Sequence, residues 1–242
     1  MAIKIFADGA NLAEIEELAA DSRISGFTTN PTLMRKAGVK NYEAFCRGAL
    51  ELIGDKPISF EVFADDHEAM YRQAHTLAEW GENVYVKIPV TNSKGHNSLR
   101  VINSLNREGI NVNVTAVFTA KQVAEIGRAL NDSGYSAIIS IFAGRIADTG
   151  RDPFHAMQHH VAGLAMLCPH VEVLWASPRQ VLDVYEAERA GCHIITVTKA
   201  ILDKMSLFVK DLEDYSLETV RMFHDDAKAS GYKLAGAKVL MP

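Results

Sequence analysis

The chain has 242 residues, 48% of them hydrophobic and 23% charged, which is ordinary for a soluble globular protein. Its 25 basic and 30 acidic residues give a net charge of −5, which is no electrostatic signature of a nucleic-acid-binding or membrane-surface protein. The three cysteines, Cys46, Cys168 and Cys192, are scattered along the sequence, which shows neither a secretory leader nor an apolar run of ~18–20 residues. We therefore predict a cytoplasmic protein with reduced thiols.

Short apolar strands alternate with amphipathic helices along the chain. Strands are predicted at Ile3–Ala7, Ile24–Thr28, Ile58–Phe63, Val84–Ile88, Asn111–Ala116, Ala137–Phe142, Val171–Ala176 and His193–Val197. Helices are predicted at Leu12–Ala20, Tyr42–Ile53, His67–Glu79, Ser98–Glu108, Lys121–Asn131, Phe154–Met166 and Pro178–Arg189, with a final pair near Lys199–Val209 and Leu217–Ala229.

Eight βα units in a row, without a hairpin signal or a linker, predict an α/β fold. We expect a single (β/α)8 TIM barrel domain over residues 1–242, with a C-terminal helical extension at about 199–230. A doubly wound open sheet is the alternative. That fold usually has a glycine-rich phosphate loop after its first strand, and Asp8-Gly9-Ala10-Asn11 is not one.

Lys87 stands alone in the apolar strand Val84–Ile88. An ammonium buried there is costly unless it is paired, or unless it loses its proton and works as an amine. A lysine in an apolar pocket is the usual nucleophile for forming a Schiff base with a carbonyl substrate. Taken alone, Lys87 is better explained as a strand-end lysine whose methylenes reach along the strand to solvent, because such lysines are common.

The other strands carry matching polar residues. Side chains in a barrel strand alternate between the interior and the helix layer. On the interior parity, six polar residues fall at the ends of strands: Asp8, Asn30, Glu61, Lys87, Thr115 and Ser140. The C-terminal ends of barrel strands form the mouth where active sites lie. Each has a structural explanation, such as helix capping by Asn30, but the whole set predicts amine catalysis by Lys87 with Asp8 and Glu61 as proton-transfer groups.

The seventh strand ends in a candidate phosphate site. Ala176-Ser177-Pro178-Arg179 places a hydroxyl, backbone amides and a guanidinium at a strand-to-helix junction. Arg145 approaches the same mouth from the loop after the sixth strand. The alternative is that either arginine pairs with a surface acid such as Asp148.

Five separated motifs, in family order between Ile3 and about Thr198, resemble those of transaldolases and the related fructose 6-phosphate aldolases. They are Gly26-Phe27-Thr28-Thr29-Asn30-Pro31, Val84-Tyr85-Val86-Lys87-Ile88-Pro89, Asn111-Val112-Asn113-Val114-Thr115, Ser140-Ile141-Phe142-Ala143-Gly144-Arg145-Ile146-Ala147-Asp148 and Ala176-Ser177-Pro178-Arg179.

The resemblance implies a role for each matching residue. Lys87 would form the Schiff base with a ketose phosphate, and Asp8 would be the acid/base of carbon–carbon cleavage. Glu61 and Thr115 would position a water during imine formation. The dihydroxyacetone unit would be held by Asn30, Asn113 and Ser140, with Thr28 and Phe142 beside them, and the phosphate by Arg145, Ser177 and Arg179. No metal or organic cofactor is implied.

Glu61 and Phe142 separate two branches of the family. Transaldolases carry Glu and Phe at these positions, whereas free aldolases carry Gln and Tyr. The resemblance therefore implies a transaldolase of the pentose phosphate pathway type, transferring dihydroxyacetone from sedoheptulose 7-phosphate or fructose 6-phosphate to an aldose phosphate. The short chain resembles the aldolase-like branch, so release of free dihydroxyacetone is the alternative. Short relatives form pentamers or decamers, which implies a homo-oligomer.

Two hypotheses of other classes remain. A sugar-phosphate-binding barrel without catalysis would keep the phosphate site but not need Lys87. His155 and His159, four residues apart on one helix face, could chelate zinc, but the sequence places no third ligand nearby and a solvated face explains them better.

Overall fold

The computed structural model describes residues 3–233, and its strands form one closed parallel barrel. The strands are β1 (Lys4–Asp8), β2 (Ile24–Thr28), β3 (Ile58–Glu61), β4 (Val84–Pro89), β5 (Val112–Val117), β6 (Ala137–Ile141), β7 (Val171–Trp175) and β8 (Ile194–Val197). Neighbours follow chain order, and β8 pairs with β1 to close the ring. The predicted (β/α)8 barrel is confirmed, and the doubly wound sheet is excluded because an open sheet leaves two edge strands.

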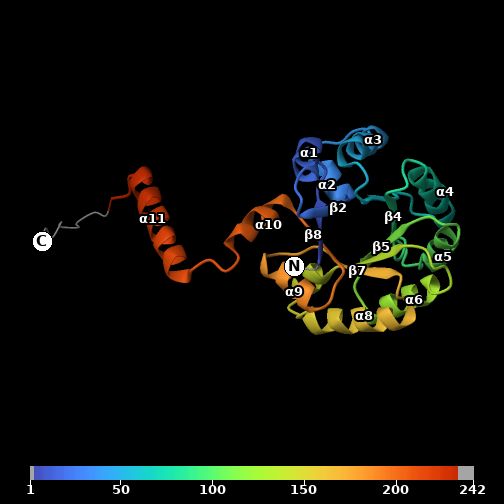
Figure 1. Cartoon of the computed structure of the whole chain (residues 1–242). Coiled ribbons are helices and arrows are strands. Elements are labelled where there is room, and N and C mark those ends of the chain that lie inside the picture. The colour runs from blue at the N-terminus through green and yellow to red at the C-terminus, as the bar shows by residue number, and fades with distance from the viewer. Residues whose placement is uncertain (1–2, 234–242) are drawn as a thin grey trace, which may run out of the picture. The chain divides into compact units, whose positions relative to one another are not determined.

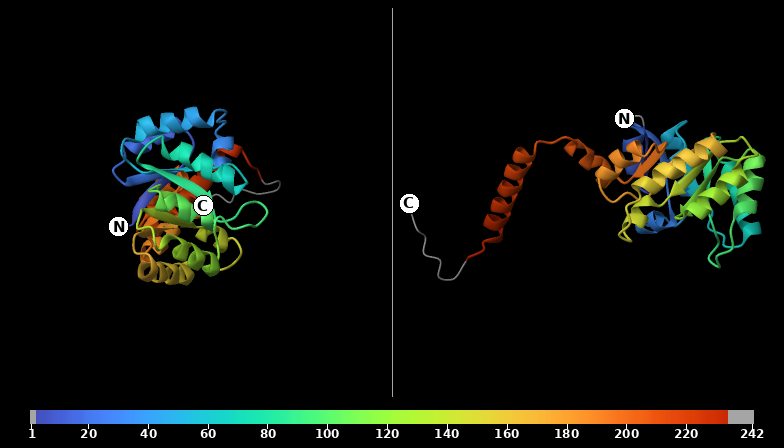
Figure 2. Two further views of the ribbon diagram at one scale, coloured as in Figure 1. Left: turned by 90° about the vertical axis from the view of Figure 1, so that its right-hand side faces the viewer. Right: turned by 90° about the horizontal axis from the view of Figure 1, so that it is seen from below.

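Helices surround the ring of strands, as Figure 1 and the two views of Figure 2 show. They are α1 (Leu12–Ala19), α2 (Pro31–Lys36), α3 (Tyr42–Ile53), α4 (His67–Ala78), α5 (Leu99–Arg107), α6 (Ala120–Leu130), α7 (Ala143–Ala147), α8 (Phe154–Leu167), α9 (Leu182–Arg189) and α10 (Lys199–Lys204). Further along the chain follow a 3₁₀ turn at Met205–Leu207 and α11 (Leu212–Ser230). The predicted helix ranges include neither of the short helices α2 and α7, because two turns or fewer give too little periodicity to detect. Only the start of α2 was indicated, by Asn30 as a helix cap before Pro31.

Polar side chains fix where several helices begin. Asn30 accepts a hydrogen bond from the backbone N–H of Leu33, with Pro31 in the first turn of α2. Asp66 caps α4 in the same way, and Thr119 and Gln122 form a reciprocal capping box on α6. Because α2 follows β2 directly, its cap fixes one wall of the barrel mouth.

The lower interior of the barrel is closed by apolar side chains. Phe6 packs in a buried cluster with Ile138, Leu174 and Ile194. A Cβ on Gly26 would lie 2.7 Å from the Phe6 ring, so only glycine leaves room for that ring. The polar residues of the same interior parity lie above this floor, toward the C-terminal ends of the strands.

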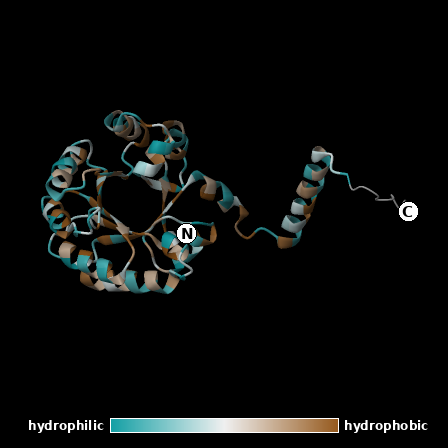
Figure 3. Cartoon of the chain, turned by 180° about the vertical axis from the view of Figure 1, so that it is seen from behind, coloured by the Kyte–Doolittle hydropathy of each residue, from teal (hydrophilic) through white to brown (hydrophobic). Residues whose placement is uncertain are grey.

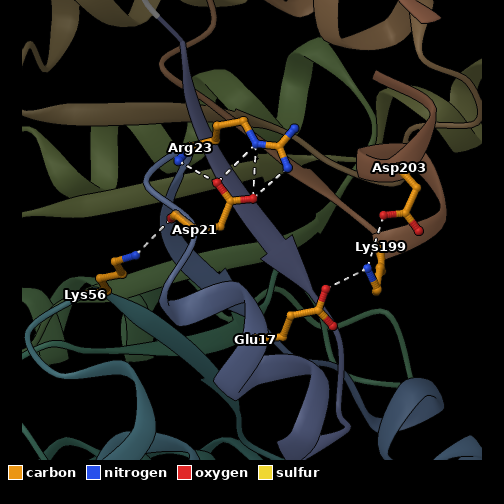
Figure 4. Close-up of polar contacts among 6 residues, drawn as sticks. All are labelled: Glu17, Asp21, Arg23, Lys56, Lys199 and Asp203. Atoms are coloured by element: carbon orange, nitrogen blue, oxygen red, sulfur yellow. Dashed lines mark hydrogen bonds and ion pairs between the residues drawn. The ribbon is translucent and has the colours of Figure 1, made fainter. Parts of the chain in front are cut away.

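Polar contacts on the outside of the barrel form two groups, one in the turn between α1 and β2 and one between α1 and α10 (Figure 4). Asp21 accepts hydrogen bonds from the side chain of Arg23, the shortest at 2.6 Å. The Lys199 ammonium lies 3.1 Å from a carboxylate oxygen of Glu17 and 3.1 Å from one of Asp203. These exposed pairs join the last helix of the barrel to the first.

The described chain divides into two compact units, one ending at Asp203 and the second beginning at Lys204. The second contains α11, which confirms a C-terminal helical extension. No side chain of α11 is buried, and its apolar residues, among them Leu212, Val220 and Phe223, are exposed beside its polar ones (Figure 3). The single domain over residues 1–242 stays a prediction. Within residues 3–233, no helix is both long and apolar enough to cross a membrane.

Candidate active site

A cavity of about 490 Å³ opens at the C-terminal ends of the strands. Eleven of the twelve predicted site residues line it: Asp8, Thr28, Asn30, Glu61, Lys87, Thr115, Ser140, Phe142, Arg145, Ser177 and Arg179. The twelfth, Asn113, lies outside the lining set. Barrel geometry thus gathers side chains that are up to 171 positions apart in the sequence (8 to 179) into one site.

Lys87 lines this cavity and is only 6% exposed. Its ammonium donates a 2.8 Å hydrogen bond to the backbone carbonyl of Thr29. It also lies 3.6 Å from Oε2 of Glu61, the residue directly opposite on β3. A buried lysine held by one carbonyl and one carboxylate has a defined direction, with the amine turned to the cavity wall shared by β2 and β3.

Asp8 ends β1 on the opposite side of the cavity. Burial raises the pKa of its carboxyl above the ordinary value, although the positive charge of Lys87 and hydrogen bonds from Thr28 and Asn30 act in the other direction. The Thr28 hydroxyl donates to Oδ1 of Asp8 at 2.9 Å. A carboxyl whose pKa is raised by desolvation is suited to both accepting and returning a proton.

Asn113 lies beneath the cavity. It is fully buried, and its amide donates to Ser59 Oγ at 2.9 Å while its carbonyl oxygen accepts from Ser140 Oγ at 2.7 Å. Both ends of the Asn113 side chain are therefore engaged within the protein. The sequence identified its interior parity but could not show that β3 and β6 supply partners for it.

Thr115 and Ala116 shape the β5 side of the cavity. The Thr115 hydroxyl is buried and makes no hydrogen bond to any residue in the described part of the chain. Ala116 adopts a φ of 60°, a left-handed conformation that is strained for a residue with a Cβ. This kink coincides with a shift in the β5–β6 register between Val114 and Val117.

The candidate phosphate site is built where two loop backbones touch. A Cβ on Gly144 would lie 1.6 Å from the carbonyl oxygen of Ser177, so glycine is required at this contact. The Gly144 N–H donates to the Ala176 carbonyl at 3.2 Å, and Ser177 adopts a φ of 59°. The loops after β6 and β7, which carry the two arginines, are thereby fixed against each other.

The two arginines differ in their partners. Arg179 forms a two-pronged ion pair with Asp148, with Nη2 at 2.5 Å from Oδ2, and this bond lowers the pKa of Asp148. Arg145 instead lies over the Phe142 ring, 5.2 Å from its centroid. The ion pair foreseen as the alternative for either arginine is thus present at Arg179.

Backbone amides contribute less to this site than expected. The N–H groups of Arg179 and Gln180 both donate to the buried carboxylate of Asp183, at 2.5 and 3.3 Å. Because α9 begins at Leu182 and not at Pro178, these amides belong to the turn that precedes the helix. An anion here would meet side chains first.

Other side chains of the cavity wall lie outside the predicted set. Lys36 reaches it from α2, and Thr196 and Thr198 from the end of β8. Thr196 shares the interior parity of Ile194, so the alternation that identified the other strands could also have found it. Lys36 had no such signal, because the sequence indicated only where α2 begins, at Asn30 and Pro31, and not its range.

The histidines of α8 offer no metal site. His159 Nδ1 lies 2.7 Å from the backbone carbonyl of His155, and His155 Nδ1 lies 3.2 Å from the Gln158 amide oxygen. Among residues 3–233, no three histidine, cysteine or carboxylate side chains gather as metal ligands would.

Sequence comparisons extend over nearly the whole chain. The family model described as "Transaldolase/Fructose-6-phosphate aldolase" matches residues 5–234. A "Probable transaldolase" of Thermoanaerobacter sp. strain X514 is 35% identical over 232 residues, 96% of this chain and 100% of that protein. A "Probable transaldolase" of Methanococcus maripaludis is 35% identical over 216 residues, 89% of this chain and 94% of that protein.

Among solved structures, the type I 3-dehydroquinate dehydratase of Clostridium difficile superimposes with a TM-score of 0.55 at 11% identity, over 81% of this chain and 84% of that one. The 3-keto-L-gulonate-6-phosphate decarboxylase of Vibrio cholerae gives a TM-score of 0.55 at 14% identity, over 82% and 88%. At such identities the likeness concerns the barrel fold alone.

Proposed function

The chain belongs to the transaldolase/fructose-6-phosphate aldolase family, and from this we propose that it transfers a dihydroxyacetone unit between sugar phosphates through a Schiff base on Lys87. The observation that carries the proposal is the position of Lys87, which is buried, lines the cavity and is held by Thr29 and Glu61. The donor we propose is sedoheptulose 7-phosphate or fructose 6-phosphate, and the acceptor an aldose phosphate, as in the pentose phosphate pathway.

Lys87 begins the reaction. Its neutral amine attacks the C2 carbonyl of the ketose, giving a carbinolamine that loses water and becomes an iminium. The amine must first give up a proton, and Glu61 Oε2, at 3.6 Å, is the nearest carboxylate oxygen. The iminium then withdraws electrons from C3, so no metal or organic cofactor is needed for the next step.

Asp8 acts on the bond between C3 and C4. Its carboxylate accepts the proton of the C4 hydroxyl as that bond breaks, leaving an aldose phosphate and an enamine on Lys87. In the transfer direction the enamine carbon attacks the aldehyde of the acceptor, and Asp8 returns the proton to the new hydroxyl. Burial raises the pKa of the Asp8 carboxyl, which favours this exchange because Asp8 can keep the proton between cleavage of the donor and addition to the acceptor.

Glu61 and Thr115 are proposed to handle water during imine formation and hydrolysis. Both line the cavity next to Lys87, one strand away on either side. The Thr115 hydroxyl, which has no partner among the described residues, can donate to or accept from a bound water, and the Glu61 carboxylate can orient it.

Hydrogen bonds of the dihydroxyacetone unit are proposed to come from Asn30 and Ser140 at the cavity wall, beside Thr28 and Phe142. Asn113 supports them from below, because its carbonyl fixes the Ser140 hydroxyl. Its predicted contact with substrate thus becomes a supporting contact in this proposal.

The phosphate is proposed to bind at the loops after β6 and β7. Arg145 has no carboxylate partner in the described contacts, and Arg179 is oriented by Asp148 so that only part of its guanidinium is engaged. Ser177 adds a hydroxyl. Of the two acids near the arginines, Asp148 pairs with the Arg179 side chain and Asp183 accepts from the Arg179 and Gln180 backbone amides. Arg145 is therefore the guanidinium that we propose attracts the phosphate to this end of the cavity.

Transfer and free aldol cleavage share all of these steps except the last. With Glu61 and Phe142 in place, we propose transfer as the main activity and release of free dihydroxyacetone as the alternative. A coupled assay with fructose 6-phosphate, with and without erythrose 4-phosphate, separates them: product that requires the acceptor supports transfer, and dihydroxyacetone without it supports cleavage.

Borohydride trapping tests the Schiff base directly. After incubation with fructose 6-phosphate and reduction, mass spectrometry of the digest should find the dihydroxyacetone adduct on Lys87. Lys36→Met removes the other cavity lysine and is the matched control, which should still be labelled. A folded protein without an adduct on Lys87 would contradict the mechanism and favour a non-catalytic sugar-phosphate-binding barrel.

We further propose a cytoplasmic homo-oligomer. Cys46, Cys168 and Cys192 are buried and free, which is consistent with a reducing compartment. Among the described residues of the second unit, no apolar side chain of α11 is buried, and a second copy of the chain is the partner we propose for its exposed apolar residues. Light scattering of the full chain and of a chain ending at Asp211 tests this, with a smaller assembly expected for the shortened chain.

A further inference from the structure

Three polar side chains from neighbouring strands form a continuous row at the edge of the cavity. Thr28 Oγ1 lies 2.9 Å from Asp8 Oδ1 and 2.5 Å from Thr196 Oγ1. Thr28 is 2% exposed and Thr196 is 6% exposed, so neither hydroxyl exchanges freely with solvent. The row runs from β1 through β2 to β8, across the closure of the barrel.

The number of protons fixes the direction of these bonds. A carboxylate can only accept, so the one proton of the Thr28 hydroxyl goes to Asp8 Oδ1. The contact between Thr28 and Thr196 also needs one proton, and only the Thr196 hydroxyl can supply it. Thr196 therefore donates to Thr28, and Thr28 donates to Asp8.

We propose that Thr196 is a positioning residue for the acid/base Asp8, acting through Thr28. The Thr196 hydroxyl donates a hydrogen bond to the Thr28 oxygen, so the Thr28 hydroxyl proton points to Oδ1 of Asp8. Oδ2 of Asp8 is then the oxygen that exchanges a proton with the substrate. A donor that itself accepts a hydrogen bond is polarised and binds a carboxylate more strongly. This inference rests on the proposed role of Asp8.

Other groups that face Asp8 also influence the protonation of its carboxyl. Lys87 on β4 is the opposing charge, and Glu61 on β3 is paired with it. Asn30, after β2, adds a hydrogen bond, while β8 contributes only the hydroxyls of Thr196 and Thr198 to the cavity. Lys36, Arg145 and Arg179 are the remaining charged groups of the cavity wall. None of these charged groups contacts Thr196 in the described hydrogen bonds. Loss of the Thr196 hydroxyl therefore changes only the hydrogen bonds that join Thr196, Thr28 and Asp8.

Loss of the Thr196 hydroxyl should destabilise the charged form of the Asp8 carboxyl more than its neutral form. Thr28 still donates to Oδ1 when the proton is on Oδ2, but without Thr196 it is less polarised and free to rotate. Burial already raises the pKa of Asp8. Thr196→Val should raise it further, by about half a unit to one unit, and lower kcat by roughly threefold to tenfold.

Carbon NMR of the full chain labelled at the aspartate carboxyl carbon measures this titration without requiring turnover. The Asp8 signal is assigned as the one missing from Asp8→Asn. Thr196→Val should titrate at higher pH than the wild type, and Thr196→Ser, which keeps the hydroxyl, should titrate like it. Thr198→Val is the matched control, because it removes another β8 hydroxyl of the same cavity. If Thr196→Val does not fold, Thr196→Ala removes the same hydroxyl without an added methyl.

Two results would overturn the proposal: an Asp8 titration in Thr196→Val that overlays the wild type, or an equal shift in Thr196→Ser or Thr198→Val. The acid limb of the kcat/KM profile should move with the NMR titration. A wild-type protein that forms no Lys87 adduct would refute the proposed function, whereas the NMR titration would still decide the role of Thr196.

Discussion

Two clusters of charged residues lie in different surroundings. Asp8, Glu61 and Lys87 meet inside the barrel mouth, whereas Asp21, Arg23 and Lys199 make the polar contacts on its outer surface (Figure 4). The pKa of Asp8 is raised, chiefly by burial, while that of Asp21 is lowered, chiefly by the hydrogen bond from Arg23. Inside the barrel mouth, desolvation has a larger effect on the pKa of Asp8 than its charged and hydrogen-bonding partners have. On the outer surface, the hydrogen bond from Arg23 has a larger effect on the pKa of Asp21 than desolvation has.

In the proposed mechanism, this difference separates groups that react from groups that support the fold. An exposed pair is most stable when both partners are fully charged, so it has no tendency to exchange protons. A buried carboxyl held near a lysine is less stable when charged than in water, and the fold must offset that cost elsewhere. Substitutions in the two clusters should therefore have opposite consequences for activity and for stability.

Removal of the lysine in each cluster should give the largest contrast. Lys87→Met should lower transfer activity by at least about 10³-fold, because the nucleophile is lost. Lys199→Met breaks contacts with Glu17 and Asp203 on the outside and should leave kcat and KM unchanged. A coupled assay of the two variants decides this. Comparable losses in both would mean that Lys87 acts through the fold.

Asp8→Asn should reduce kcat by roughly 10²–10⁴-fold, since the proton acceptor is gone. The same change should increase the free energy of unfolding at neutral pH. A carboxyl with a raised pKa favours folding while protonated and loses that advantage as pH rises above its unfolded pKa, so a neutral amide removes the cost. Urea unfolding at pH 7 measures it. A less stable Asp8→Asn variant would indicate that the pairing with Lys87 dominates.

The arginines allow the next comparison. Arg145→Ala should raise KM for a ketose phosphate by about 10–100-fold, as expected for the loss of a charged hydrogen bond to phosphate. Its effect should be smaller for an unphosphorylated ketose. Arg23→Ala, on the outer surface, should not change KM for either substrate. Initial rates with the phosphorylated and unphosphorylated sugars test both variants, and an equal effect on the two sugars would contradict phosphate binding by Arg145.

Asp21→Asn should have the smallest effect, a loss of less than about 1 kcal/mol in the free energy of unfolding. Because the pKa of Asp21 is lowered in the folded protein, its contribution is present above the ordinary carboxyl pKa. It should disappear as pH falls through the lowered value, and it should shrink with added salt. Unfolding curves of both proteins between pH 7 and pH 2 measure the difference, which should be widest at the upper end.

Strand positions and interior parity were accessible from the sequence because both follow from periodicity. The alternation in β3, β4 and β6 identified Glu61, Lys87 and Ser140 on one face, and all three line the cavity. Their catalytic roles stay predictions.

Contacts between strands were not accessible in the same way. The engagement of Asn113 with Ser59 and Ser140 depends on side-chain geometry across three strands. The use of the Arg179 and Gln180 amides by Asp183 depends on where α9 begins. Neither leaves a local pattern in the sequence.

The Phe6 ring, seated against Gly26, has a consequence for the order of kinetic events. Since the barrel is closed below by apolar side chains, donor, first product and acceptor all use the same opening at the strand ends. The first aldose phosphate must depart before the acceptor enters, which predicts ping-pong kinetics with parallel double-reciprocal plots. In the proposed mechanism, the enamine on Lys87 would stand throughout that interval in an unfilled, water-accessible pocket. The lifetime of this intermediate would then set how many turnovers end in transfer and how many in loss of the three-carbon unit.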